Sequence, residues 1–113
     1  MLKFGQSNEI NGSIQVKVRS IYIVPNTTTH EGTVTQWRLF KEGELSTISG
    51  INANIINPGT ELEPHEHETV EHVYFILGGV GVARVGDEEQ EIREGDAIHM
   101  PPRLIHTIRN TGT

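Results

Sequence analysis

The sequence predicts an all-β protein folded as an antiparallel sandwich or a small barrel. Short apolar or alternating segments recur along the chain, and Gly, Pro and Asn residues separate them at close intervals. No segment shows the apolar spacing of an amphipathic helix. About nine or ten short strands separated by turns are typical of sandwiches and barrels.

The N-terminal half contains three predicted strand regions. The first alternates apolar and polar side chains before a denser apolar run, which predicts one strand or two strands with a bend near Ser20. The last ends at the turn signal Asn57-Pro58-Gly59. The expected order is a polar segment over 1–12, strands over 13–24, 33–41 and 51–56, a loop over 25–32, and a turn over 42–44.

The C-terminal half is predicted to be denser in strands. A short His-x-His strand at 65–67 comes first, and the apolar run 73–77 reads as the next strand. Gly86-Asp87 is a hairpin signal, and Pro101-Pro102 ends a short strand. The remaining strands are expected over 80–85, 88–93, 97–100 and 104–109, followed by a tail.

Composition limits the classes of partner and site. A chain of 113 residues is one domain, and with no cysteine it can hold a metal only through nitrogen and oxygen. The net charge is −6 and no basic cluster occurs, so neither a nucleic acid nor a membrane partner is expected. Nothing resembles a secretory signal or a membrane span, and these features together predict a cytoplasmic protein with a small-molecule ligand.

One short stretch concentrates side chains of metal-ligand type. His65 and His67 are two residues apart, so on a strand both imidazoles leave the same face. Glu71 follows after a short link, and His106 is the candidate for a fourth ligand from elsewhere in the chain. By the same alternation, His72 is expected to face away from the site as a solvated or interface histidine. His30 and His99 are likewise expected to be ordinary histidines.

The spacing of these residues resembles both motifs of the cupin superfamily. The first motif is matched by Gly59, five residues, His65-x-His67, three residues, Glu71, six residues and Gly78. The second is matched by Gly95, five residues, Pro101, and then His106, three residues and Asn110. The resemblance implies a double-stranded β-helix, or jelly-roll barrel, and His65, His67, Glu71 and His106 as ligands of one divalent metal ion per chain. Three imidazoles and a carboxylate suit Mn, Fe, Ni, Cu, Co or Zn.

Two further residues are predicted to contact a substrate. Phe75 has the same strand parity as Glu71, so it is expected to line the cavity. Arg103 stands where the family usually has glycine, and it would meet a carboxylate at the barrel mouth or be a solvated turn arginine. Because a type I turn needs no positive φ, such a turn is expected at Pro102-Arg103.

Two functional hypotheses stay open on these residues. The first is an enzyme acting on a small oxygen-rich metabolite: a dioxygenase, or an isomerase or lyase working through a metal-bound enolate. No general base can be identified from the sequence. The alternative is a non-catalytic metal-dependent module that binds or senses a small molecule.

The sequence also predicts a homodimer. Cupins usually have a strand after the second motif, whereas this sequence has three residues after Asn110. The N-terminal strands within 1–45 are therefore expected to close the barrel or to pair with a second subunit, while 57–110 carry the metal motifs.

Overall fold

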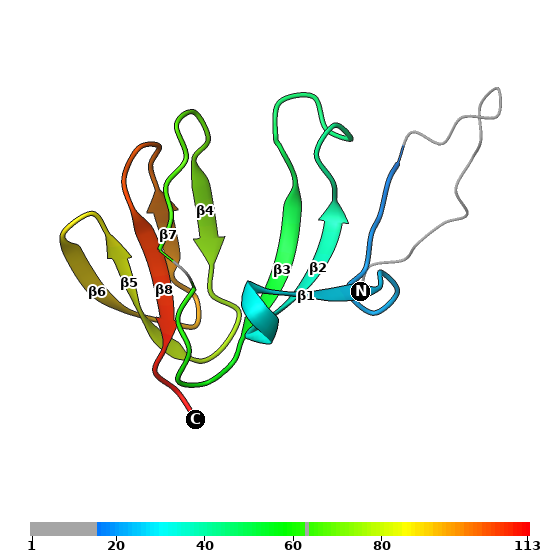
Figure 1. The fold of residues 1–113 in the computed structure, drawn as a ribbon. Helices are drawn as coiled ribbons and strands as arrows, with labels where there is room; N and C mark the ends of the chain where they lie inside the picture. The colour runs from blue at the N-terminus through cyan, green and yellow to red at the C-terminus, as the bar shows by residue number, and fades with distance from the viewer. Residues whose placement is uncertain (1–15, 63) are drawn as a thin grey trace, which may run out of the picture.

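A computed structural model describes residues 16–62 and 64–113, and within these ranges it contains eight strands and one 3-10 turn (Figure 1). The strands form three sheets, and every strand pairing is antiparallel. The all-β prediction is confirmed. In the described part of the chain, no helix is both long and apolar enough to cross a membrane.

The first sheet has the order β1-β2-β3, with bounds Asn26–Thr29, Val34–Phe40 and Ile51–Ile56. The predicted strands over 33–41 and 51–56 are confirmed. The predicted loop over 25–32 is wrong, because it contains β1 and the 3-10 turn η1 (His30–Gly32). Three consecutive β-branched threonines favour the extended chain of β1, and Thr29 pairs with Val34 of β2.

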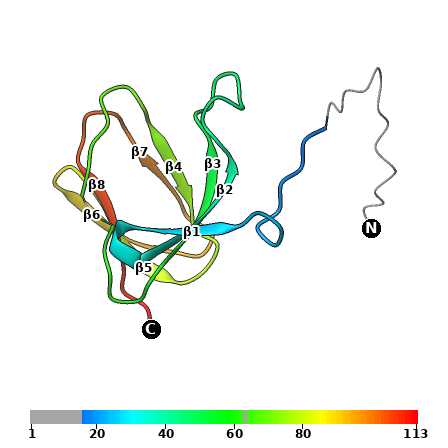
Figure 2. The same ribbon diagram turned by 45° about the vertical axis from the view of Figure 1, so that its right-hand side comes forward.

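The predicted strand over 13–24 is wrong where the structure describes it. Residues 16–20 have no regular structure, and a turn over 21–24 is closed by the Val24 N–H donating to the Ser20 carbonyl at 2.9 Å. Alternation stabilises a strand only when a neighbouring strand accepts its hydrogen bonds and its apolar face. Tyr22 is 92% exposed, and both views show this segment leading away from the sheets (Figures 1 and 2). Residues 1–15 lie outside the described residues.

The remaining strands form a three-stranded and a two-stranded sheet. The order β6-β5-β8 joins Glu88–Arg93, Val80–Val85 and His106–Asn110, and β4 (His72–Phe75) pairs with β7 (Ala97–Met100). These five strands confirm the predicted strands from residue 73 onward, with changes at the ends of β4 and β8, but the predicted strand at 65–67 is wrong, because only His65 forms an isolated bridge there. Gly86, at a φ of 58°, forms the predicted two-residue hairpin with Asp87, where glycine adopts positive φ without strain.

Residues 59–62 and His65 lie along the free edge of β8 and bond to it irregularly. Leu62 N–H donates to the Ile108 carbonyl, and Asn110 N–H donates to the Thr60 carbonyl, both at 2.9 Å. The Asn110 side chain donates to the Ile56 carbonyl at 2.7 Å, which ties the end of β3 to β8. These bonds bring the first motif alongside the second.

The core draws side chains from all three sheets and from Leu62, which lies beside β8. Met100 is fully buried, and Val34 is 2% exposed. The other buried members are Leu62, Ala83, Ile92 and Ile108. Figure 2 shows β4 and β7 side by side, opposite the sheet that carries β8. This closure around one apolar interior is the jelly-roll arrangement.

Candidate metal centre

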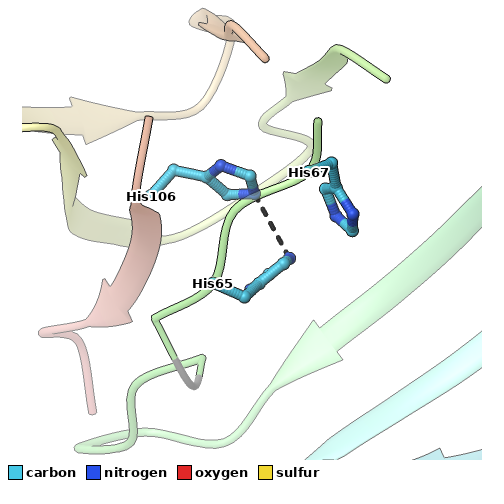
Figure 3. Close-up of side chains that lie close together, drawn as sticks. All are labelled: His65, His67 and His106. Atoms are coloured by element: carbon cyan, nitrogen blue, oxygen red, sulfur yellow. Dashed lines mark hydrogen bonds between the residues drawn. The ribbon is translucent and has the colours of Figure 1, made fainter. Parts of the chain in front are cut away.

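Three histidine side chains from two distant parts of the chain converge. One ring nitrogen from each of His65, His67 and His106 lies within 4.8 Å of the others (Figure 3). His106 is 2% exposed, and the other two are half-buried. The structure therefore brings together the three histidines that the motif spacing selected.

Backbone hydrogen bonds hold the two motifs in register at this point. His65 and His106 face each other in an antiparallel bridge, with N–H to carbonyl distances of 3.3 and 2.9 Å. The Arg103 N–H donates to the His67 carbonyl at 2.6 Å. His67 lies in no strand, yet the extended backbone keeps its ring 5.0 Å from that of His65. The expectation that both rings leave one face is confirmed.

The orientation of His106 is set by its second ring nitrogen. Nδ1 lies 3.2 Å from the Leu104 carbonyl oxygen, so Nδ1–H donates there and Nε2 carries the lone pair. That Nε2 is 3.2 Å from Nε2 of His65. An outer hydrogen bond of this kind fixes metal-binding histidines in the tautomer that coordinates.

The donor set fits a divalent ion. Two nitrogens held about 2.05 Å from one ion are about 3.3 Å apart in a tetrahedral shell and at most about 4.1 Å apart in any shell. The His65–His106 separation of 3.2 Å matches the first value, and the widest separation, 4.8 Å, requires a small inward rotation. The buried Nε2 of His67 has no hydrogen-bond partner among the described residues. A buried nitrogen without a partner is costly, and an ion would satisfy it.

The cluster favours neutral imidazoles. Burial lowers the pKa of His106, and the neighbouring His65 and His67 lower it further, against an opposing effect of the bond to Leu104. Burial is also the first cause of the lowered pKa of His72, followed by the three clustered histidines. Neutral imidazole is the form that binds metals, so this environment reduces competition from protons.

His72 faces the cluster, and the prediction that it faces away is wrong. Its ring lies 4.8 Å from that of His67 and 5.8 Å from that of His106. On β4 it pairs with the fully buried Met100. Directly opposed residues of an antiparallel pair share a face, so His72 points inward.

Glu71 lies on the other side of β4 from His72. Its Oε2 is 2.9 Å from Nε2 of His99, and both side chains are more than half exposed. Glu71 is therefore not brought to the three histidines in this structure, and its role as a ligand stays a prediction. His99 was expected to be an ordinary histidine, and its bond to Glu71 was not foreseen.

Phe75 does not line the interior. Its side chain is 61% exposed and shares the outer face with Val73, because the alternation along β4 is opposite to the predicted one. Tyr74 takes the inner position, where burial raises the pKa of its phenol and its ring lies 6.0 Å from that of His72. The sequence allows either alternation, and the pairing partners on β7 decide between them.

Arg103 adopts a φ of 64°, so the predicted turn without positive φ is wrong. The N–H bond to His67 fixes the backbone at this point. The side chain lines an open depression of about 690 Å³ together with Glu66, Arg84 and Asp87, and none of the three histidines lines it. A role for Arg103 in substrate binding stays a prediction.

Comparisons with known proteins agree with this geometry. The family profile described as "Cupin domain" matches residues 54–113, just over half of the chain. An uncharacterised protein of Methanocaldococcus jannaschii is 38% identical over 58 residues, which are 51% of this chain and 46% of that protein. A gentisate 1,2-dioxygenase of Haloferax sp. is 41% identical over 46 residues, 41% of this chain and 13% of that enzyme. The chain thus spans less than half the length of these two relatives.

Solved structures show the same fold. A predicted oxalate decarboxylase of Thermotoga maritima superimposes with a TM-score of 0.71 at 23% identity, covering 86% of this chain and 90% of that one. KdgF from Halomonas sp. gives 0.74 at 13% identity, covering 87% and 84%. A cupin 2 conserved barrel domain protein from Rhodopseudomonas palustris gives 0.61 at 26% identity, covering 79% and 62%. With both motifs, the jelly-roll fold and the matching profile in place, the chain belongs to the cupin superfamily.

Proposed function

We propose that this cupin binds one divalent metal ion through His65, His67 and His106 and uses it to act on a small oxygen-rich metabolite. The observation that carries the proposal is the convergence of three imidazoles from two motifs, one of them with a buried, unpartnered nitrogen. A bound divalent ion would supply Lewis-acid or oxygen-activating chemistry at this position.

The chain's own residues supply the setting for that chemistry. The two backbone bonds between His65 and His106 hold two ligands at a separation that suits one ion. Neutral imidazoles add no charge, so they leave the ion's positive charge available to an anionic ligand. The phenol of Tyr74, kept neutral by burial and close to His72, is placed to donate a hydrogen bond near the cluster.

The relatives are consistent with an enzymatic role. The protein of Haloferax sp. that shares a 46-residue segment is a gentisate 1,2-dioxygenase. That segment is a small part of the enzyme, so the comparison supports dioxygenase chemistry as a class and does not assign the substrate. An isomerase or lyase acting on a hydroxyacid uses the same kind of centre, and a non-catalytic binding module would also retain the three histidines.

Metal analysis of wild type and His67→Ala tests the centre itself. We expect close to one divalent ion per chain in wild type and a sharp loss in the variant. His30→Ala is the matched control, because this histidine lies on η1, outside the described cluster. Equal metal content in wild type and His67→Ala would contradict the proposed site.

Oxygen uptake separates the enzyme from the binding module. Protein loaded with Fe(II) without air is mixed with a diketone, a catechol or a hydroxyacid, and air is then admitted. Substrate-dependent oxygen consumption supports a dioxygenase. Product formation without oxygen uptake supports an isomerase or lyase, and saturable binding with neither identifies a binding module.

A further inference from the structure

We infer that His72, and not Glu71, completes the metal centre, so that the ion is held by four imidazoles. This inference rests on the proposed function, because it concerns the fourth ligand of the same site. It departs from the ligand set that the family motif implies, and it follows from the register of one pair of strands.

The register places His72 inside. On the β4–β7 ladder His72 is opposite Met100, Val73 is opposite His99, and Tyr74 is opposite Ile98. Met100 is fully buried, whereas Val73 is 69% exposed. Since opposed residues share a face, the inner face of β4 carries His72 and Tyr74. Glu71 precedes His72 and belongs with the outer set.

Ring positions agree with a single ion. An imidazole centroid lies about 3.2 Å from an ion that its nitrogen binds, so two bound rings have centroids about 4.5 Å apart in cis and about 6.4 Å apart in trans. The centroid separations are 4.4 Å for His65–His106, 5.0 Å for His65–His67 and 5.7 Å for His67–His106. His72 adds separations of 4.8 Å to His67 and 5.8 Å to His106. Both of these values fall within the range expected of a shared ion.

Glu71 is engaged elsewhere. Its Oε2 is 2.9 Å from His99 Nε2 on the neighbouring strand β7, on the outer face. To reach the cluster, Glu71 would have to break this bond and leave the outer face. His72 already lies on the inner face with its ring 4.8 Å from that of His67, and because the group of ligand atoms within 4.8 Å of one another comprises only the other three histidines, the inference requires the His72 side chain to move toward them.

An imidazole in place of a carboxylate as the fourth ligand changes the charge of the site. Four neutral imidazoles leave the full charge of +2 on a divalent ion, whereas a carboxylate ligand would reduce it to +1. A site of imidazoles alone favours Cu, Ni, Co and Zn over Mn, which prefers oxygen ligands. Anionic bidentate ligands such as oxalate should therefore bind the loaded centre more strongly than neutral ones.

Copper(II) alone is the probe for this inference. Pulsed electron paramagnetic resonance counts the imidazole nitrogens on the copper of the wild-type protein, and titration calorimetry measures its affinity. We expect four imidazoles in wild type and three in His72→Gln, with affinity lowered at least about tenfold, as loss of even an outer-shell partner can cost. Glu71→Gln should keep four imidazoles and change affinity less than twofold, and His99→Gln serves as the outer-face control.

The outcomes distinguish two failures. Three imidazoles in wild type, with a copper spectrum altered by Glu71→Gln, would overturn the inference and restore the carboxylate ligand. Unchanged affinity and nitrogen count in His67→Gln would instead remove the histidine centre and the proposed function with it. The number of imidazole nitrogens on copper in the wild-type protein tests the inference even where a variant fails to fold.

Discussion

Replacing Arg103 with glycine should stabilise this protein, although the change removes a whole side chain. Arg103 has a φ of 64°, in the left-handed region. There the Cβ of an L-residue crowds the following carbonyl oxygen at a cost of about 1–2 kcal/mol, and glycine avoids this cost. Glycine also loses about 0.4–1 kcal/mol more conformational entropy on folding. The side chain contributes little, because it is exposed and forms no side-chain hydrogen bond or ion pair with the described residues.

The net expectation for Arg103→Gly is a gain of about 0.5–1 kcal/mol in unfolding free energy. For a chain of this size, that gain corresponds to a rise of about 2–4 °C in Tm. The N–H donor to the His67 carbonyl is retained, so metal content should not change. Calorimetry and urea unfolding of the metal-free protein would measure both quantities.

Arg103→Ala is the control for the arginine side chain. Alanine keeps the Cβ and its strain while removing the guanidinium, so Tm should stay the same or fall slightly. A glycine variant no more stable than the alanine variant would refute the assignment of strain to φ. A glycine variant that also loses metal would show that the side chain, and not only the backbone, holds His67 in place.

Three further predictions follow from the same structure. Gly81→Ala should lower the unfolding free energy, measured by urea unfolding, by about 1–3 kcal/mol, because the added Cβ would lie 2.5 Å from a carbonyl oxygen on β8. Gly78→Ala is the control, since its Cβ would meet nothing within 4 Å and should change the unfolding free energy little. Burial lowers the pKa of His72 and His106 in the folded protein, so below pH 6.5 the unfolded chain binds more protons than the folded one. The unfolding free energy of metal-free protein, measured by urea midpoints at several pH values, should be highest above pH 6.5 and fall as the pH drops through the lowered pKa values of the folded state. The exposed apolar side chains of residues 16–24 should be covered by a second copy, giving a dimer in light scattering, and a monomer at micromolar concentration would contradict this.

Much of the site could be predicted because the sequence features that indicate it, residue spacing and turn residues, act over a few neighbouring residues. The separation of His65 and His67 by one residue puts two imidazoles on one face of any extended segment, and the backbone confirms this without forming a regular strand there. Turn residues such as Gly86 mark the ends of strands, so the strands over 80–85, 88–93 and 97–100 were predicted with their observed bounds. Local conformational preference is carried by the residues themselves.

The N-terminal segment shows the opposite case. Residues 16–24 alternate like a strand, and the threonines of β1 look like a loop, but the structure reverses both assignments. A strand is stable only against a partner, and the sequence of one segment does not say which other segment lies beside it.

The face of β4 was decided by the tertiary structure alone. Glu71 and His72 are adjacent, and shifting the alternation by one residue exchanges their roles along with those of Tyr74 and Phe75. Nothing within the segment selects between the two phases, because both sets contain apolar residues. The pairing of His72 with the buried Met100 makes the selection, and it depends on a strand that lies about 25 residues further along the chain. The sequence by itself therefore predicted that His65, His67 and His106 lie together, and the long-range register decided that His72, and not Glu71, lies on the inner side of β4 facing them.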